Sequence, residues 1–451
     1  MKKYEEYKAS KYDWLGSVPS QWSERSVRSL THLSDERNGN RNDLELLSVY
    51  REYGVIRKNS RDDNHNVESA DLSNYKVVHK NYLVLNKMKA WQGSMGISHY
   101  EGIVSPAYIV CSLAEDINPT YLHYLLRSKP FITEYNRLSY GIRVGQWDMR
   151  YDDFKNILLY TPSQSEQAQI VKYLDWKVSK INKYIKAKKR QIELLKELKQ
   201  AEINRAVTKG LDPNVPLKDT QNNWIDSIPS HWKEKYLFQI AKERKVSNKK
   251  MYNQNLLSLS YGNIVNKDIN QTEGLLPASY DTYQIINDGN IVLRLTDLQN
   301  DQKSLRVGLS SQEGIITSAY TCLECVGDAL PEYIYYLLHS YDISKIFYGM
   351  GGGLRQSMGY KEIKKLIAYT FSKEEQQQIV LHCNYIVNQK DKAVERLNET
   401  ISYLEELRSS LISDIVTGKV DVRDIEVPDD YEVGEVSDEI DNNMEETDND
   451  E

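Results

Sequence analysis

The chain has 451 residues, of which 40% are hydrophobic and 27% are charged. This length allows two or three domains with substantial cores. No window approaches 18 uncharged apolar residues, which excludes a membrane-spanning helix. The first residues, MKKYEEYKASKYDW, lack the apolar stretch of a signal peptide, and four cysteines do not predict a disulfide framework. We therefore expect a cytoplasmic protein.

The net charge of -7 combines two unlike parts. Residues 421–451 hold 15 Asp and Glu and one Arg, whereas the remainder holds 57 Lys and Arg against 50 Asp and Glu. The body is therefore mildly basic. The last 31 residues have few aromatics and high charge, which predicts an acidic disordered tail over 421–451. This tail either keeps the chain soluble or imitates nucleic acid and covers the basic body.

The dominant pattern is an internal duplication with an offset of 208 to 212 residues. Five colinear segments recur: WLGSVPSQW at 14–22 as WIDSIPSHW at 224–232, LLSV at 46–49 as LLSL at 256–259, EGIVSPAY at 101–108 as EGIITSAY at 313–320, YLHYLLRS at 121–128 as YIYYLLHS at 333–340, and EQAQIV at 166–171 as EQQQIV at 375–380. Chance does not produce five such matches, and two copies are too few for a solenoid. The chain is predicted to be a tandem pair with pseudo-twofold character.

In the first copy, a lead segment over 1–23 precedes a mixed module over 24–160. Short alternating runs such as 82–85 predict strands between Gly, Asn and Asp turns. One helix is predicted over 119–129, with a proline in its first turn. We expect a compact globular module of the α/β (α+β) class.

A long helix is predicted over 163–210 because apolar residues recur there with a heptad spacing. The seam consists of Val171, Leu174, Val178, Ile181, Ile185, Ile192 and Leu195, and Lys188 interrupts it. A surface amphipathic helix is the alternative, but its stripe would drift with a period of 3.6 residues. At 1.5 Å per residue, 43 helical residues would extend about 64 Å.

The second copy repeats this order: a linker over 211–234, a module over 235–370, and a long helix over 372–420. Its predicted strand lies at 291–295 and its short helix at 331–340. The second seam consists of Val380, Val387, Val394, Leu397, Ile401, Leu404 and Leu411, and Lys390 interrupts it. We expect the two long helices to form an antiparallel intramolecular coiled coil between the modules, with the polar core positions fixing its register.

Basic and glycine-bearing loops are the candidates for DNA contact, because base readout needs forked donors and phosphate contact needs Lys, Arg and hydroxyls. In the first module the candidates are Arg57, Lys58, Arg61, Lys87, Lys89, Trp91, Gln92, Arg143 and Gln146. In the second they are Arg244, Lys245, Lys249, Lys250, Arg294, Thr296, Gln299, Lys303, Arg306, Arg355 and Gln356. Taken singly, each residue is more typical of a solvated surface charge than of a base reader. These loops differ between the two copies, whereas the recurring segments match.

Three motifs resemble catalytic or metal sites but have plainer interpretations. Asn118-Pro-Thr-Tyr121 is similar to a motif with which adenine methyltransferases grip a flipped base, yet 329–333 lacks the Asn, so a helix start is favoured. Cys322-Leu-Glu-Cys325 has no second ligand pair for zinc, and a core strand is favoured. The run 349–353 lacks the ending of a phosphate loop, and we favour a DNA-contacting loop over a plain turn. We therefore expect no catalytic residue and no metal site.

The order of these motifs resembles that of the specificity (S) subunit of type I restriction-modification systems. The shared pattern is a Trp-x4-Pro-x2-Trp entry, a variable module, an Asn-Pro-x-Tyr-Leu-x2-Leu-Leu helix and a Pro-x3-Glu-Gln-x2-Ile-Val start of a long helix. This order is given twice over 11–420, with Leu330 in place of the Asn in the second copy. The departures are Phe371, which stands where the first copy has Pro162, and the acidic tail.

The resemblance implies two target-recognition domains that each read half of a split, asymmetric DNA sequence. The long helices would be conserved spacers that dock two methyltransferase (M) subunits, and restriction and translocation (R) subunits would join them. It also implies that this chain binds no cofactor, while the partner subunits use S-adenosylmethionine, ATP and Mg.

Two other functions remain as alternatives to this non-catalytic recognition role. A stand-alone DNA methyltransferase or nuclease would need a cofactor loop that we do not find. A coiled-coil adaptor without a DNA role would not depend on the basic loops. The target, the spacer length, the stoichiometry and the role of the tail cannot be predicted from the sequence.

Overall fold

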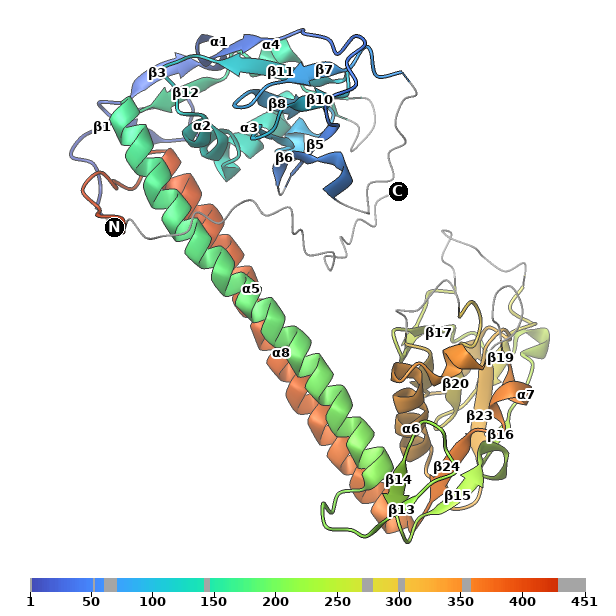
Figure 1. Cartoon of the computed structure of the whole chain (residues 1–451). Coiled ribbons are helices and arrows are strands. Elements are labelled where there is room, and N and C mark those ends of the chain that lie inside the picture. The colour runs from blue at the N-terminus through green and yellow to red at the C-terminus, as the bar shows by residue number, and fades with distance from the viewer. Residues whose placement is uncertain are drawn as a thin grey trace. The chain divides into compact units, whose positions relative to one another are not determined.

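The computed structural model describes residues 2–51, 53–60, 71–141, 147–269, 279–298, 305–350 and 358–428. The chain divides into two compact units: unit 1 comprises residues 1–188 and 399–451, and unit 2 comprises residues 189–398. Each unit contains one mixed module and one part of each long helix (Figure 1). The predicted mixed class, with two modules and two long helices, is therefore confirmed.

The module of unit 1 is built on an antiparallel sheet with the order β4-β11-β8-β9. Its strands are β1 Tyr7–Ala9, β2 Ser17–Pro19, β3 Ser23–Ser26, β4 Thr31–Leu33, β5 Leu47–Tyr50, β6 Gly54–Arg57, β7 Lys76–Val78, β8 Leu83–Asn86, β9 Met95–Ile97, β10 Gly102–Val104, β11 Tyr108–Leu113 and β12 Leu158–Thr161. Its helices are α1 Val27–Leu30, η1 Lys58–Ser60, η2 Ala90–Gln92, α2 Pro119–Leu126, α3 Lys129–Leu138 and α4 Tyr151–Phe154.

The module of unit 2 repeats this sheet with the order β16-β23-β20-β21. Its strands are β13 Leu217–Asp219, β14 Ser227–Pro229, β15 Lys233–Tyr236, β16 Ala241–Glu243, β17 Leu257–Ser260, β18 Asn263–Asn266, β19 Gln284–Ile286, β20 Ile291–Leu293, β21 Val307–Leu309, β22 Gly314–Ile316, β23 Thr321–Cys325 and β24 Ile367–Thr370. Its helices are η3 Leu237–Gln239, η4 Lys249–Met251, α6 Pro331–Ile343, η5 Ile346–Gly349 and α7 Tyr360–Ile363.

Strand pairing shows that the duplication extends to the register. In β1–β2 the residue opposite Pro19 is Tyr7, and in β13–β14 the residue opposite Pro229 is Leu217. The chain enters the modules through β3 and β15 and leaves through β12 and β24, and each entry strand pairs with its exit strand. The duplicated sequence therefore produces the same frame in both units.

The short helix of each module begins at the predicted proline. Asn118 caps α2, because its side chain accepts a hydrogen bond from Tyr121 N at 3.0 Å. This geometry confirms a helix start in place of a base-gripping motif. The predicted helix over 119–129 is wrong at its end, since α2 stops at Leu126 and α3 starts separately after Ser128. In unit 2, α6 continues without a break to Ile343.

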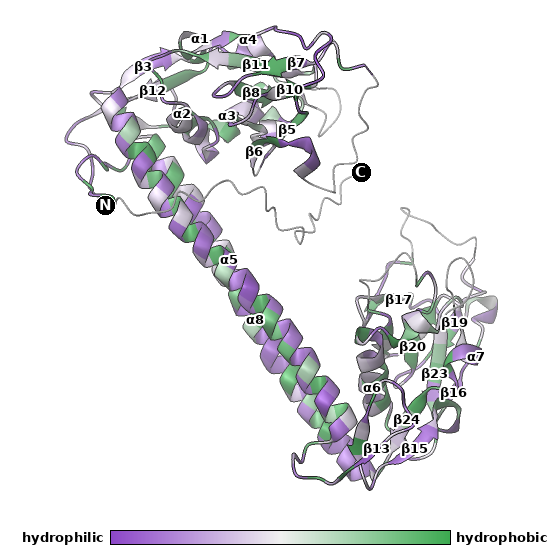
Figure 2. Cartoon of the chain, in the orientation of Figure 1, coloured by the Kyte–Doolittle hydropathy of each residue, from purple (hydrophilic) through white to green (hydrophobic). Residues whose placement is uncertain are grey.

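The two long helices are α5, Gln164–Lys209, and α8, Lys373–Val416. They pair antiparallel in both units: Arg408 Nη1 donates to Asn182 Oδ1 at 2.7 Å in unit 1, and Lys199 Nζ lies 2.6 Å from Asp391 Oδ1 in unit 2. Every predicted seam residue is buried or half-buried, and apolar positions are interleaved with polar ones along both helices (Figure 2). Lys390, at the polar core position of α8, pairs with Glu202 of α5 at 3.3 Å.

Residues 421–428 do not belong to a disordered tail, so the prediction is wrong for them. In unit 1, Asp421 N donates to Lys2 O at 2.9 Å, and the side chains of Val422 and Val427 are buried. Residues 429–451 lie outside the described residues.

A buried tryptophan joins each module to the start of a long helix. In unit 1, Trp22 Nε1 donates to Glu166 Oε1 at 3.0 Å, and Tyr4 Oη donates to the same oxygen at 2.7 Å. In unit 2, Trp232 Nε1 donates to Glu375 Oε1, also at 3.0 Å. The Trp-Pro entry and the Glu-Gln helix start are therefore two halves of one contact.

The glutamine beside each glutamate fixes the short helix against the long one. Gln167 Oε1 accepts from Asn118 N at 2.8 Å, and its Nε2 donates to Pro162 O at 3.0 Å. Gln376 Oε1 accepts from Leu330 N at 2.9 Å, and its Nε2 donates to Phe371 O at 3.1 Å. We call the Trp–Glu bond and these Gln bonds the junction of each unit.

We predict that Glu166→Ala lowers the free energy of unfolding by about 2–4 kcal/mol, because two buried donors, Trp22 Nε1 and Tyr4 Oη, lose their acceptor. Glu166→Gln retains an oxygen acceptor and should cost less. Urea unfolding of the full chain measures both changes. Equal stability of the alanine variant and the unchanged chain would show that the junction does not stabilise unit 1.

Candidate nucleic-acid interface

Two candidate segments of unit 2 leave the central sheet at the same end. In unit 2, β16 and β20 both pair antiparallel with β23, so they run in the same direction. The segments that follow them, which start at Arg244 and Arg294, therefore emerge on the same side. In unit 1, β4 and β8 have the same relation through β11.

In unit 1 the segment after β8 lies beside the end of the glycine-bearing loop. Met149 N donates to Lys87 O at 2.9 Å, and Lys87 Nζ lies 3.3 Å from Asp148 Oδ2. The ring centroids of Trp91 and Trp147 lie 5.1 Å apart. The structure thus brings the predicted segment 87–92 next to residues 147–149, while Arg143 and Gln146 lie outside the described residues.

Unit 2 repeats this contact with different side chains. Met358 N donates to Leu295 O at 2.8 Å, at the position equivalent to the bond between Met149 and Lys87. The backbone pairing is thus repeated in the two units, while the residue after the strand differs between them.

Other predicted residues lie on the surface with acidic or carbonyl partners. Arg57 lies 2.9 Å from Glu45 and 5.0 Å from the ring of Tyr100. Arg244 donates to Ile285 O, and Lys245 pairs with a neighbouring glutamate. Of the remaining candidates, the side chains of Lys89 and Lys249 are exposed, and those of Lys58, Trp91, Gln92, Arg294 and Thr296 are half-buried.

Arg306 is not a surface reader, and that prediction is wrong. Its side chain is fully buried. The guanidinium donates to three carbonyls of the segment after β20: Nη1 to Arg294 O at 3.1 Å and Thr296 O at 2.8 Å, and Nη2 to Asp297 O at 3.3 Å. Its Nε donates to Tyr348 Oη at 3.0 Å. Arg306 therefore stabilises the conformation of residues 294–297 through buried hydrogen bonds, and none of these donors faces solvent.

Several predictions cannot be placed. Arg61, Arg143, Gln146, Gln299, Lys303, Arg355, Gln356 and the side chain of Lys250 lie outside the described part of the chain. No sequence pattern pointed to Trp147 and Asp148, whose contacts with Trp91 and Lys87 exist only in the folded module. Nor did any pattern point to Arg127, whose guanidinium donates to Met95 O at 2.8 Å.

The cysteine motif is a core strand, as predicted. Cys322 is buried in β23, and burial raises the pKa of its thiol to about 12. All four cysteines are unpaired. Among the residues that the structure describes, no cluster of three His, Cys, Asp or Glu side chains could hold a metal ion.

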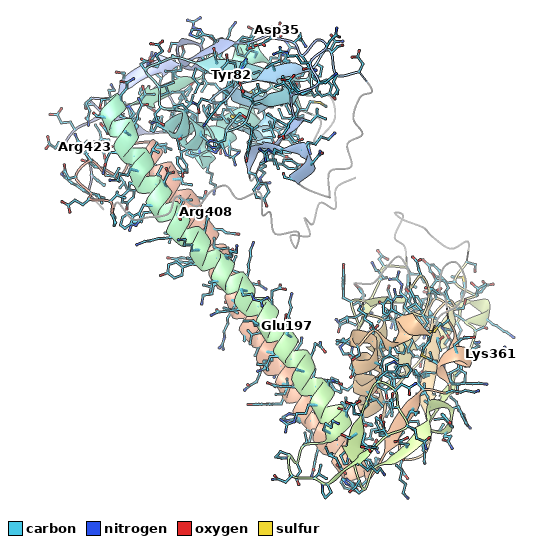
Figure 3. The ribbon with its side chains drawn as sticks, viewed as in Figure 1. Asp35, Tyr82, Glu197, Lys361, Arg408 and Arg423 are labelled. Atoms are coloured by element: carbon cyan, nitrogen blue, oxygen red, sulfur yellow. The ribbon has the colours of Figure 1, made fainter. Side chains whose placement is uncertain are left out.

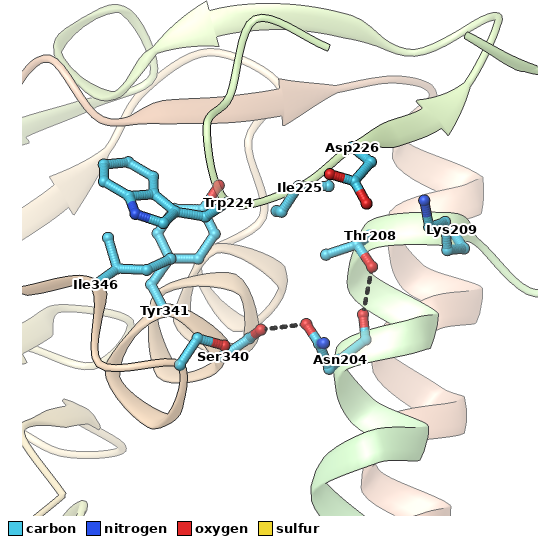
Figure 4. Close-up of a pocket in the computed structure, with 10 residues that line it drawn as sticks. Asn204, Thr208, Lys209, Trp224, Ile225, Asp226, Ser340, Tyr341 and Ile346 are labelled. Carbon is cyan, nitrogen blue, oxygen red and sulfur yellow. Dashed lines mark hydrogen bonds between the residues drawn. The ribbon is translucent and has the colours of Figure 1, made fainter. Parts of the chain in front are cut away.

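A small pocket lies in unit 2 where α5 ends against α6 and the linker (Figure 4). Its cavity volume is about 160 Å³. Ser340 Oγ donates to Asn204 Oδ1 at 2.6 Å, and Lys209 Nζ donates to Ser227 Oγ at 2.6 Å. Small-molecule sites usually have volumes of about 300–1,000 Å³. This pocket is smaller than that range, and its polar groups bond to one another across the end of α5.

Comparison with known proteins agrees with this architecture. The family model for the type I restriction modification DNA specificity domain matches residues 19–194. No curated protein matches the chain. A chain from a structure described as "Structural basis underlying complex assembly and conformational transition of the type I R-M system" is 14% identical, with a TM-score of 0.63, and the match covers 89% of this chain and 99% of that one.

Two further solved structures match with lower scores. The HsdS subunit from Thermoanaerobacter tengcongensis is 15% identical, with a TM-score of 0.47 and coverage of 89% and 98% of the two chains. The type I restriction-modification S subunit from M. genitalium is 14% identical, with a TM-score of 0.33 and coverage of 87% and 96%.

This fold defines a class of protein in which two globular modules are combined with a pair of long helices. The match over 19–194 shows that the first copy is similar to the type I restriction modification DNA specificity domain. The predicted resemblance to type I specificity subunits is thereby confirmed for this copy, and the likeness to the structure with a TM-score of 0.63 shows the same fold over 89% of the chain. In the described residues, none of the helices is both long and apolar enough to cross a bilayer.

We predict that Arg306→Lys loosens the segment after β20. A lysine cannot reach three carbonyls and a hydroxyl together, and the lost charged hydrogen bonds should cost about 2 kcal/mol or more. Hydrogen exchange should become faster at residues 294–298 while unit 1 is unchanged. Lys249→Met, on an exposed side chain, is the matched control. Unaltered exchange in the Arg306 variant would disprove the internal bracing role.

Proposed function

We propose that this chain is the non-catalytic DNA sequence-recognition subunit of a type I restriction-modification enzyme. Each module reads one half of a bipartite, asymmetric target. The chain docks two M subunits and the R subunits, and S-adenosylmethionine, ATP and Mg act in those partners. Its cellular place is the cytoplasm, where the DNA target is accessible.

This proposal rests on a difference between two parts of the modules. The junctions are the same in both units, and the segments that follow β8 and β20 are not. The junctions use the same Trp–Glu and Gln bonds in both units. The segments after β8 and β20 share a backbone bond from a methionine, Met149 or Met358, but the residue that accepts it is Lys87 in unit 1 and Leu295 in unit 2. A repeated frame with unlike side chains at one sheet end favours two readers of different sequence.

Docking of partner subunits is supported by apolar side chains that the helix pair leaves in solvent. The exposed members on α5 and α8 are Tyr184, Leu194, Leu198, Leu381, Tyr385, Tyr403 and Leu407. Helices that only separated two modules would not need them, and exposed apolar surface is typical of protein interfaces. We assign these residues to the M subunits.

We predict that substitutions in the two modules affect the two half-sites separately. Lys89→Ala with Gln92→Ala should relax one half-site, and Lys245→Ala with Lys249→Ala should relax the other, because each pair lies in one module. Long-read mapping of methylated adenines in cells with each variant, and in cells without the chain, measures this. A lost base contact typically costs about 1–3 kcal/mol of discrimination.

The spacing between the half-sites should be the same in both variants, since neither pair lies on the long helices. A pattern of methylated adenines that is the same in cells with and without the chain would contradict the recognition role. A pattern in which either variant relaxes both halves equally would contradict the assignment of one module to one half-site.

A further inference from the structure

The outer face of α5 in unit 1 is basic. Lys172, Trp176, Lys180 and Lys183 follow one another at helical spacing and so lie on one side of the helix. They occupy positions opposite the heptad seam, which places them on the side away from α8. With Lys177 and Lys186, which lie beside this row, we call these residues the basic face.

The charge along this part of α5 is of a single sign. Residues 176–188 contain five lysines and no Asp or Glu. The equivalent stretch of the second copy, 385–397, mixes Lys390, Lys392 and Arg396 with Asp391 and Glu395. Both stretches belong to helices of the same coiled coil, so a heptad seam does not by itself require a stretch of one sign.

The lysines of the basic face crowd around one indole ring. Lys177 Nζ lies 3.9 Å and Lys180 Nζ 4.6 Å from the ring centroid of Trp176. The ring attracts both ammonium groups, yet they repel each other. Burial, and then the nearby Lys180, lower the pKa of Lys177. An anion beside this cluster would relieve the repulsion.

The described residues after α8 end at the start of this face. Gln169 Nε2 donates to Val422 O at 3.1 Å and to Ile425 O at 2.7 Å. Arg423, labelled in Figure 3, donates to both carboxylate oxygens of Asp421, at 3.0 and 2.8 Å. Residues 423–428 line a groove together with Gln169 and Lys172. Pro428 is therefore held next to the first lysine of the basic face.

The next 23 residues of the sequence, 429–451, contain 12 Asp and Glu and no Lys or Arg. An extended chain of that length reaches roughly 75 Å. The basic face, from Lys172 to Lys186, is about 21 Å long at 1.5 Å per residue. The segment can therefore cover the face from its anchor.

We propose that the acidic segment 429–451 docks on the basic face of α5 and excludes other polyanions, duplex DNA included, from it. The occupant is this segment because it is anchored at the face, which gives it an effective concentration of the order of millimolar. Free duplex at lower concentration competes poorly for the same lysines. A target held by the two modules does not need this face, so the segment suppresses binding that lacks sequence recognition.

Carbodiimide crosslinking of the full chain tests the docking directly. At low salt, Lys177, Lys180 and Lys186 should form amide crosslinks to carboxylates of 429–451. The crosslinks should disappear near 1 M salt, where the Debye length falls to about 3 Å. Crosslinks spread evenly over lysines elsewhere, such as Lys361, Lys364 and Lys365 of unit 2, would overturn the proposal.

Binding of an arbitrary 30-base-pair duplex gives the second readout. A chain that stops after Pro428 should bind it several-fold more tightly than the full chain at low salt, with the difference lost at high salt. Lys177→Glu, Lys180→Glu and Lys186→Glu together should remove that difference. The matched triple, Lys361→Glu, Lys364→Glu and Lys365→Glu, should retain it.

Two results would contradict the docking. The first is equal duplex affinity of the full and shortened chains. The second is a charge-reversed face that weakens duplex binding equally with and without 429–451, which would make the face a DNA surface. Thermal unfolding confirms that each variant folds. Because the duplex has no defined target, the outcome is independent of the half-site recognition proposed above.

Discussion

The architecture depends on one buried contact, the bond between a tryptophan N–H and a glutamate in the first turn of a long helix. In unit 1 it joins Trp22 to Glu166, and in unit 2 it joins Trp232 to Glu375. A buried indole donor without an acceptor is costly, so this bond fixes the angle at which each module meets its helix. The neighbouring glutamines then connect the short helix to the same turn. Conservation of the contact between the copies explains why the loops elsewhere are free to differ.

The departure from the repeat at Phe371 follows from the same contact. Its ring stacks on Trp232 with centroids 4.0 Å apart and an interplanar angle of 8°, and it lies edge-on to Tyr333. In unit 1, Trp22 instead has Tyr4 edge-on at 5.9 Å, from a segment that packs against residues after α8. Each tryptophan therefore has an aromatic neighbour, supplied by a different part of the chain.

Features with a repeated sequence signal could be predicted, and features that depend on tertiary partners could not. The heptad seams, the helix starts and the strand cores follow from periodicity, and all are present in the structure. Arg306 was assigned to the surface because a lone Arg in a polar stretch usually lies there, but the carbonyls it binds come from the strand end at Arg294. The order of residues 421–428 depends on Lys2 and Gln169, which are remote in sequence. Nothing in the sequence pointed to Trp147, because its contact with the ring of Trp91 exists only in the folded module.

The pairing of each entry strand with its exit strand has a consequence for how such a protein changes over time. Because β3 lies beside β12 and β15 beside β24, the two ends of each module are held together regardless of the length of chain between them. Insertions, deletions or wholesale replacement inside a module leave the helices and their seam undisturbed. Sequence changes in the variable segments are thereby separated from the parts that must remain constant. One module can therefore acquire a new sequence during evolution without a change in the other module.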